Sequence, residues 1–360
     1  MQMAKTTIAA AGHAQKKLPF VAVLANPTTG HVFASFANLA DVIIGEPGAL
    51  IGLSPLGSLR QGTRKPISVD AHTAESQLEN GMVDMVVDRA SLRDLLAVLL
   101  DVLQPRFVLT ARQKLERQAY RPRSGEAWQN VQLARHTQRP TANDYFERLL
   151  TSFVDLHGDR VQGDDLGVVT GLGYLGGQGV VVLGQERSDG DRLAGAHPRG
   201  FRKAQKAMKL ASKFSLPLIT LIDTPGAAHD QESDAHGIAN ALATTTALML
   251  QVETPTVAVI IGEGGSEAAL ALSVADRILM MERAIFSPIS PEGAANLMYR
   301  DENRVEEAAE ALKLTAADCY DVGIIDAVVP EPEQGAHRNR DEAARQLRRI
   351  LLQELVDLQN

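Results

Sequence analysis

A chain of 360 residues with 45% hydrophobic content can bury the core of one large α/β domain or of two modest ones. The net charge of −8 argues against a general affinity for nucleic acid, and the single cysteine, Cys319, excludes a disulfide framework or a four-cysteine zinc site built from this chain alone. No segment has the 18 apolar residues of a membrane span or the apolar core of a signal peptide, so we expect a cytoplasmic protein without membrane contact and without a metal of its own.

Residues 1–14 resemble the end of an amphipathic helix that has no start signal, so we expect the chain to begin inside a larger element. The next segment, residues 19–55, predicts a strand at Phe20–Leu24, a loop, a small-residue helix to Leu39 and a strand at Asp41–Ile44. These strands are continuously apolar, which is typical of parallel sheets covered on both faces.

Residues 106–142 are rich in Arg, Gln and Pro and predict a linker. The following segment predicts strands at Gly179–Leu183 and Leu218–Ile222, a helix at about Phe201–Phe214, and a final charged helix at Asp341–Leu358. We therefore predict an α/β protein with a partial domain at residues 1–105, the linker, a complete domain at 143–335 and a C-terminal helix at 336–360.

The chain contains an internal repeat, because residues 255–291 follow the same order as residues 19–55. A strand at Val257–Ile261 runs into Gly262–Ser266, then a helix, then a strand at Ala275–Met280. Both copies close alike, with an apolar run that ends in Ser-Pro in the first copy and in Ser-Pro-Ile-Ser-Pro in the second.

In each copy a strand enters a loop of small residues that opens a helix, so unpaired backbone N–H groups converge at the positive end of the helix dipole. Such a site suits a thioester enolate, whose negative charge develops on one carbonyl oxygen. The candidate residues are Gly30 in the first copy and Gly264 and Gly265 in the second. A single turn of this kind also serves plain packing or phosphate binding, and both readings stay open for each copy alone.

Many ordered motifs resemble bacterial acetyl-CoA carboxylase carboxyltransferase. Residues 1–6, Pro27–Gly30 and Ala34–Ala37 look like the C-terminal part of its β subunit, and the remainder looks like its α subunit. The α-like motifs are Ala127-Trp128, Gln132–His136, Gln138–Pro140, Gly158–Arg160, Arg202–Ala204, Ile222–Ala227, Gly262–Ser266, Ile289–Gly293 and Gly335–Asn339.

The resemblance implies a crotonase-like ββα spiral, with one complete α-like domain and a partial β-like domain. It also implies transfer of a carboxyl group from carboxybiotin, held on a biotin carboxyl carrier protein, to the coenzyme A thioester acetyl-CoA, which gives malonyl-CoA for fatty acid synthesis. In the family the active sites lie between α-like and β-like domains, and the protein supplies positioning and dipoles.

The family's two oxyanion holes each use a Gly-Gly pair, and these pairs map to Gly30 and His31 and to Glu267 and Ala268. Three of the four glycines are therefore replaced, although backbone amides survive any substitution except proline. His31 and Glu267 are candidate acid or base groups, and Glu at a helix start is also explained by the dipole alone. Thr29 precedes the first pair and is a candidate for substrate binding.

A second departure follows Pro225, where Gly226 and Ala227 match the family but the next residues replace its Tyr-Pro-Gly with a segment holding His229, a second histidine and three carboxylates. Gly226, Ala227 and His229 are candidate substrate contacts, and a solvated loop is the alternative. Arg202 and Lys203 are candidate partners for the phosphates of coenzyme A, the alternative being a charged helix face.

Residues 1–105 lack the first part of the family's β subunit, so a half-sheet would keep open edges. We expect a second chain to complete it within a homo- or hetero-oligomer. Two alternatives to carboxyl transfer stay open: a biotin-independent decarboxylase, hydratase or hydrolase acting on an acyl-CoA or acyl-carrier thioester, and a scaffold subunit without catalysis.

Overall fold

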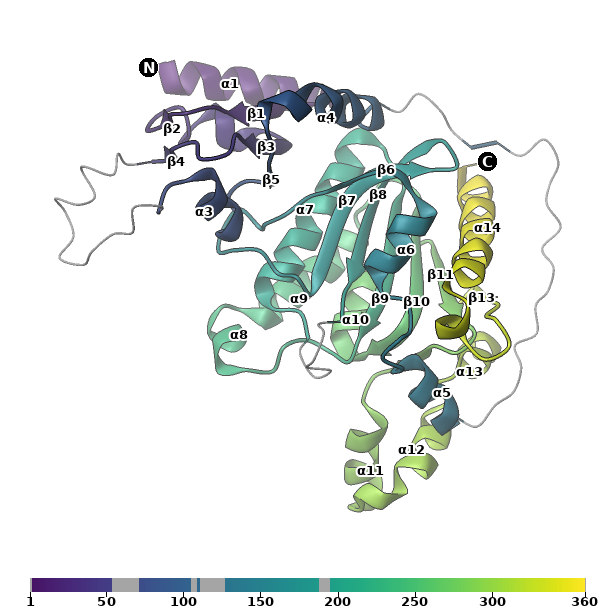
Figure 1. Ribbon diagram of the computed structural model, residues 1–360. Helices are drawn as coiled ribbons and strands as arrows, with labels where there is room; N and C mark the ends of the chain where they lie inside the picture. Colours follow the sequence, from purple (N-terminus) through teal and green to yellow (C-terminus); the bar gives the residue numbers. More distant parts are fainter. Residues whose placement is uncertain (1, 54–70, 105–108, 111–126, 188–194, 360) are drawn as a thin grey trace. The chain divides into compact units, whose positions relative to one another are not determined.

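The computed structural model describes residues 2–53, 71–104, 109–110, 127–187 and 195–359 (Figure 1). The chain divides into unit 1, which comprises Met1–Gln104 and Val154–Asp165, and unit 2, which comprises Pro105–Phe153 and Leu166–Asn360. Residues 154–165 thus group with unit 1, although the sequence predicts them inside the domain at 143–335, and residues 336–360 group with unit 2, although the sequence predicts them as a separate helix. The Ser54-Pro55 closure and about half of the predicted linker, residues 106–108 and 111–126, lie outside the described residues, whereas the rest of that segment contains α5.

Unit 1 contains a parallel three-stranded sheet of order β1-β3-β5 and a separate parallel pair of β2 and β4. The bounds of its elements are α1 Gln2–Gln15, β1 Val21–Leu24, β2 Thr28–Thr29, η1 Phe36–Leu39, β3 Val42–Gly45, β4 Ile51–Gly52, α3 Ala74–Glu79, β5 Met85–Val86 and α4 Arg89–Val102. Apolar side chains of β1, β3, β4 and the η1 region form its core.

The α-helix expected between residue 30 and Leu39 is wrong. Residues 30–35 form turns, and only the four residues of η1 are helical, with 3-10 geometry. A segment of this length is too short to nucleate a helix by itself, and Gly30 has a φ of 64°, outside the helical region. The two predicted strands around it are present as β1 and β3.

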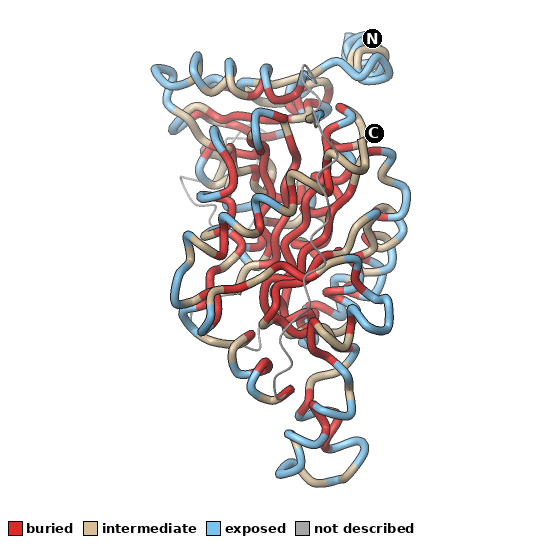
Figure 2. Tube along the Cα trace, turned by 90° about the vertical axis from the view of Figure 1, so that its right-hand side faces the viewer, coloured by how far each residue is buried: buried red, intermediate tan, exposed pale blue. Residues whose placement is uncertain are grey.

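Unit 2 is built on an eight-stranded sheet of order β13-β11-β10-β9-β8-β7-β6, with β12 also paired to β10. The strands from β8 to β13 pair in parallel, and β7 runs antiparallel to β8. The central strands are almost wholly buried, as the red core of Figure 2 shows. Their bounds are β6 Thr151–Asp155, β7 Val168–Leu175, β8 Gln178–Gln185, β9 Leu218–Thr224, β10 Thr256–Gly265, β11 Arg277–Met281, β12 Ile285–Ser287 and β13 Ala327–Val329.

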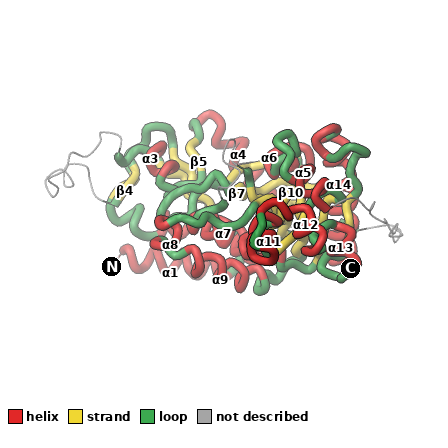
Figure 3. The backbone as a smooth tube through the Cα atoms, turned by 90° about the horizontal axis from the view of Figure 1, so that it is seen from below, coloured by secondary structure: helices red, strands yellow, loops and turns green. Residues whose placement is uncertain are grey.

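Helices of unit 2 cover both faces of this sheet, with α7, α9 and α10 on one side and α6 and α14 on the other (Figures 1 and 3). The α11 and α12 helices pack on each other. The helix bounds are α5 Ala127–Ala134, α6 Ala142–Leu149, α7 Pro198–Phe214, α8 Gln231–Ala235, α9 Ile238–Met249, α10 Ser266–Ser273, α11 Pro291–Tyr299, η2 Glu302–Arg304, α12 Val305–Leu312, α13 Ala316–Asp321, η3 Ala336–Arg338 and α14 Arg340–Gln359.

The expected strands at Gly179–Leu183 and Leu218–Ile222 are confirmed within β8 and β9, and the expected helix is confirmed as α7. Pro198 occupies the first turn of α7, where its missing N–H costs no hydrogen bond. Cys319 on α13 is 1% exposed, and burial raises the pKa of its thiol to about 12. Within the described chain, the structure shows no helix of the length and apolarity needed to cross a membrane.

Candidate functional site

The turn between β10 and α10 joins a buried strand directly to a helix. The strand ends at Gly265, and Ser266 opens the helix with a φ of 58°, which is rare for a residue with a side chain. A Cβ atom on Gly265 would lie 2.2 Å from the carbonyl oxygen of Pro225. Gly265 therefore allows the loop after β9 to approach this turn closely.

The loop after β9 is held by its own hydrogen bonds. The Thr224 hydroxyl donates to the carbonyl of Gly226 at 2.7 Å, and the amide of Ala228 donates to the carbonyl of Ala196 at 3.1 Å. Gly226 and Ala227 are buried, whereas His229 is exposed. The loop thus places an imidazole at the surface above a fixed backbone.

Ser266, Glu267 and His229 lie together around Gly226. The Ser266 hydroxyl donates to the Glu267 carboxylate. This bond, the carboxyl group's own backbone amide and the charge of His229 lower the pKa of Glu267. A carbon atom at the Cβ position of Gly226 would lie 3.8 Å from His229 Nε2 and 3.8 Å from Ser266 Cβ. Ala268, the next residue of the first turn of α10, is buried.

A buried charge lies beneath the β10 turn. Asp223, at the end of β9, accepts the amide of Glu263 at 2.9 Å and pairs with Arg187 Nε at 2.6 Å. Burial raises the pKa of Asp223 to about 6, and Arg187 opposes the increase. The pairing register of β9 and β10 shifts between Ile260 and Gly264, beside this contact. Asp223 therefore holds β10 where it bends toward the turn.

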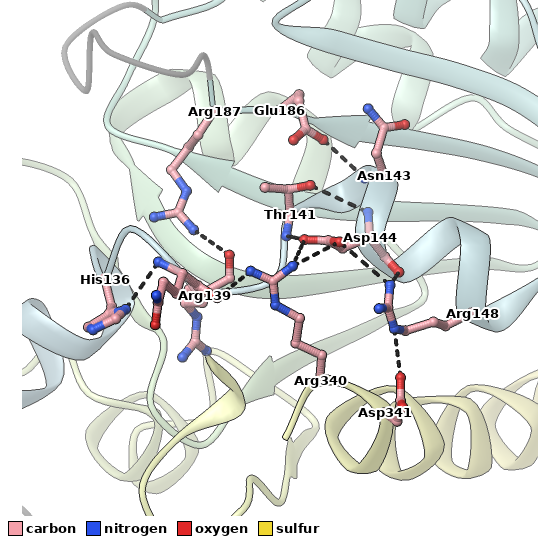
Figure 4. Close-up of polar contacts among 11 residues, drawn as sticks. His136, Arg139, Thr141, Asn143, Asp144, Arg148, Glu186, Arg187, Arg340 and Asp341 are labelled. Carbon is pink, nitrogen blue, oxygen red and sulfur yellow. Dashed lines mark hydrogen bonds and ion pairs between the residues drawn. The ribbon is translucent and has the colours of Figure 1, made fainter. Parts of the chain in front are cut away.

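A second buried ion pair, Arg139 with Glu331, contacts the backbone of β10. Arg139 and Glu331 are both 0% exposed, joined by an Nη2–Oε1 contact of 2.5 Å, and Arg139 Nε donates to the carbonyl of Ile261 on β10 at 2.7 Å. Figure 4 shows the surrounding contacts, in which Arg187 donates to the Arg139 carbonyl and Asp144 accepts from Arg340. These contacts fix the segment before α6, β10 and the start of α14 to one another.

In unit 1 the first predicted site has a different form. Thr29 is the last residue of β2, and the amide of Gly30 donates to the carbonyl of Gly52 on β4 at 3.0 Å. His31 is exposed and begins a turn rather than a helix. The Gly30 amide is therefore engaged in the protein's own hydrogen bonding.

The two basic candidates on α7 differ in exposure. Lys203 is 2% exposed, whereas Arg202 is half-buried. Across the described residues, no cluster of three or more His, Cys, Asp and Glu side chains is arranged to hold a metal ion.

Sequence reasoning missed Ser266, Asp223 and Arg187 as members of this region. Ser266 and Asp223 lie within the motifs Gly262–Ser266 and Ile222–Ala227. The signal for Asp223 is a carboxylate that directly follows the apolar run Leu218–Ile222 at the end of a central strand. Such a group is buried and needs a cationic partner.

Solved structures share this arrangement of the chain. One is a transcarboxylase 12S with methylmalonyl-coenzyme A and methylmalonic acid bound, with a TM-score of 0.78 and 18% identity over 99% of this chain and 68% of that chain. Another is a single-chain, multi-domain long-chain acyl-CoA carboxylase, with a TM-score of 0.70 and 20% identity over 91% of this chain and 32% of that chain. The protein thus has the crotonase-like α/β fold of carboxyltransferases, and the expected fold class is confirmed.

Sequence relatives identify the family to which the chain belongs within this class of carboxyltransferases. Residues 106–360 match the family described as acetyl co-enzyme A carboxylase carboxyltransferase-like, and the chain belongs to that family. The carboxyl transferase subunits beta/alpha of Salinispora tropica are 42% identical over 99% of this chain and 66% of their own length. The Clostridium tetani protein of the same name is 36% identical over 99% of this chain and 64% of its own length. The chain thus spans about two thirds of the length of these relatives.

Proposed function

We propose that this protein is the carboxyltransferase component of an acetyl-CoA carboxylase, which transfers a carboxyl group from carboxybiotin to acetyl-CoA to give malonyl-CoA. The observation that carries the proposal is the match of 99% of the chain to relatives named as both carboxyl transferase subunits, in the order beta then alpha. The internal order of β-like and α-like motifs in this chain is the same. We place the reaction in the cytoplasm, where the single Cys319 stays reduced.

The proposed work of unit 2 is to stabilise negative charge on a thioester oxygen. The amides of Glu267 and Ala268 lie in the first turn of α10, where the helix leaves N–H groups without intrahelical acceptors. Each aligned donor contributes about 3 kcal/mol to such a transition state. Gly264 and Gly265 support the proposal by keeping β10 and the Pro225 loop close to this turn.

Carboxybiotin, delivered by a biotin carboxyl carrier protein, supplies the carboxyl group in this proposal. We propose that the loop of Gly226 and Ala227, which has no large side chains at these two positions and lies beside the α10 turn, faces the ring of biotin. In unit 1 we assign the second amide donor to His31, since the Gly30 amide donates to Gly52, and Thr29 precedes it in β2. Arg202 is the proposed coenzyme A phosphate contact, because Lys203 is buried.

A second polypeptide is proposed to cover unit 1. The α1 helix has 14 residues and none of them is buried, while Ile8 is 71% exposed. The helix contacts the η1 region and Phe20, but this packing buries none of its residues fully, so a large part of α1 is free to pack on another chain. We propose that this partner is the β-like half that the family places beside such a segment, in a homo- or hetero-oligomer.

The direct test supplies a carboxylated biotin carrier protein and acetyl-CoA to the chain together with its β-like partner, and measures malonyl-CoA by chromatography. We expect malonyl-CoA to accumulate only when the carrier is carboxylated, and the uncarboxylated carrier is the control. No malonyl-CoA above that control, with the complex shown to be assembled by sedimentation, contradicts the proposal.

A further inference from the structure

The α10 turn contains the elements of a serine nucleophile. Ser266 lies at a sharp junction between a buried strand and a helix, with a φ of 58°. Hydrolases that attack carbonyl carbons hold their serine at a strained strand-to-helix turn, because this conformation lifts the hydroxyl away from the backbone. The first-turn amides of the helix that follows then lie next to the attacked carbonyl group.

The side chains around this serine supply the remaining parts. Its hydroxyl is bonded to the Glu267 carboxylate, and His229 Nε2 lies 3.8 Å from the point that a Cβ atom of Gly226 would occupy. Ser266 Cβ is also 3.8 Å from that point, so an atom there contacts both side chains at ordinary van der Waals distance. Gly226 has no side chain, so it places no atoms of its own beside either group.

Glu267 and His229, which lie beside Ser266, both differ from the family pattern. Glu267 replaces a glycine of the oxyanion pair, and His229 lies in the rewritten loop. Hydrogen bonds lie on both sides of His229, because the Ala228 amide donates to the Ala196 carbonyl and Asp230 caps α8 by accepting the Ser233 amide at 2.7 Å and the Ser233 hydroxyl at 2.9 Å. His197 Nδ1 makes a 2.9 Å contact with the same hydroxyl.

We propose that Ser266, His229 and Glu267 form a hydrolytic site that cleaves acyl thioesters without biotin. In this step the Ser266 hydroxyl turns from Glu267 toward His229, its oxygen forms a bond to the thioester carbonyl carbon, and its proton passes to His229. The amides of α10 hold the oxyanion, the C–S bond breaks, and the thiolate leaves with the proton from His229. Water then attacks the acyl-serine, gives its proton to His229, and releases a carboxylic acid as Ser266 regains its proton. Glu267 orients the hydroxyl and offsets the positive charge on the imidazolium.

The test uses the full chain with acetyl-CoA and no biotin, and measures the thiol of released coenzyme A. Wild type should release the thiol at least about 100-fold faster than Ser266→Ala or His229→Asn, since a nucleophile and its general base each contribute about 10²-fold or more. Ser273→Ala, on the same helix, and His236→Asn, in the same loop, are the matched controls, and we expect each to keep the wild-type rate within about twofold.

Chemical labelling distinguishes a nucleophilic Ser266 from a serine that has only a structural role. Phenylmethylsulfonyl fluoride should label Ser266, as located by peptide mass spectrometry, and His229→Asn should slow this labelling although the serine is still present. The proposal is overturned if Ser266→Ala keeps the wild-type release rate, if wild type releases no thiol above buffer, or if the label is absent from Ser266. Since no step needs biotin or a partner chain, failure here is separate from failure of carboxyl transfer.

Discussion

The Glu267 carboxylate accepts hydrogen bonds from its own backbone amide and from the Ser266 hydroxyl. It therefore occupies one of the two amides that carboxyl transfer is proposed to use. A glycine at this position has no side chain to compete with the substrate oxygen.

Glu267→Gly should raise the rate of malonyl-CoA formation about tenfold, which is less than the 10²- to 10³-fold effect of one complete oxyanion donor. Glu267→Gln keeps the size of the side chain and should stay near the wild-type rate in the same assay. Thioester hydrolysis should fall in both variants. A glycine variant that loses carboxyl transfer argues that the side chain takes part in the reaction instead of covering the amide.

Asp223 makes the stability of unit 2 depend on pH. Burial raises its pKa in the folded chain to about 6, above the ordinary value of 3.8, so the folded state holds this proton more tightly than the unfolded state. The contribution of Asp223 to the free energy of unfolding therefore falls as the pH rises from about 4 to about 6, by on the order of 1 to 3 kcal/mol.

Asp223→Asn should abolish this decline, as measured by urea unfolding at a series of pH values between 4 and 7. The carboxyl replaced in the control variant Asp341→Asn is 72% exposed and also pairs with an arginine. That change should alter the free energy of unfolding by less than about 1 kcal/mol. Parallel pH profiles of wild type and Asp223→Asn would refute the assignment.

The buried ion pair of Arg139 and Glu331 joins the segment before α6, the end of β11 and the start of α14. Glu331 accepts from Arg139, from the amide of Arg283 after β11 at 2.9 Å, and from the amide of Ala336 before α14 at 2.7 Å. Removing one charge of such a pair leaves the other buried without compensation, which costs about 3–5 kcal/mol.

Arg139→Met should therefore lower the free energy of unfolding by about 3–5 kcal/mol in urea titrations. Adding Glu331→Gln should recover part of this loss, because the unpaired buried charge is gone, although the amide oxygen can replace only one of the two carboxylate oxygens that accept the backbone N–H groups of Arg283 and Ala336. Arg304→Met, which breaks the exposed pair with Glu307, is the control and should cost less than about 1 kcal/mol. A double variant no more stable than Arg139→Met would show that packing, not charge, explains the loss.

Sequence patterns predicted the buried strands and long helices well, because an apolar run such as Val257–Ile261 has few alternatives to a covered strand. They failed at the segment after Gly30, whose small residues are compatible with both turns and helix. The proximity of His229 to Ser266 was also beyond reach, since it depends on how closely the Pro225 backbone approaches Gly265 across β9 and β10. Local periodicity carries no information on such long-range approaches.

For the whole molecule, the apolar surface of unit 1 makes association the expected state. Along α1 lies a hollow lined by Thr6, Ala9, Ala10, His13, Phe20 and Phe36, and Ile8 on the same helix is 71% exposed. Exposed apolar side chains and apolar hollows are typical of contact sites between proteins.

Ile8→Glu should weaken assembly with the β-like partner at least about tenfold, because a charge replaces a side chain that is proposed to be buried in the complex. Sedimentation velocity over a concentration series measures this change. Leu166→Glu alters an apolar residue that is 80% exposed in unit 2 and should leave assembly unchanged. Equal behaviour of wild type and Ile8→Glu would remove α1 from the proposed interface.

The burial of Cys319 affects how thiol reagents react with this protein. Its thiol is 1% exposed and its pKa is raised to about 12, so a disulfide reagent added to the native protein finds almost no thiolate to react with. In the hydrolysis assay the colour therefore comes from coenzyme A alone. In denaturant, the rate at which the Cys319 thiol reacts measures the opening of α13, because the thiol becomes reactive only when the residues packed around it unfold.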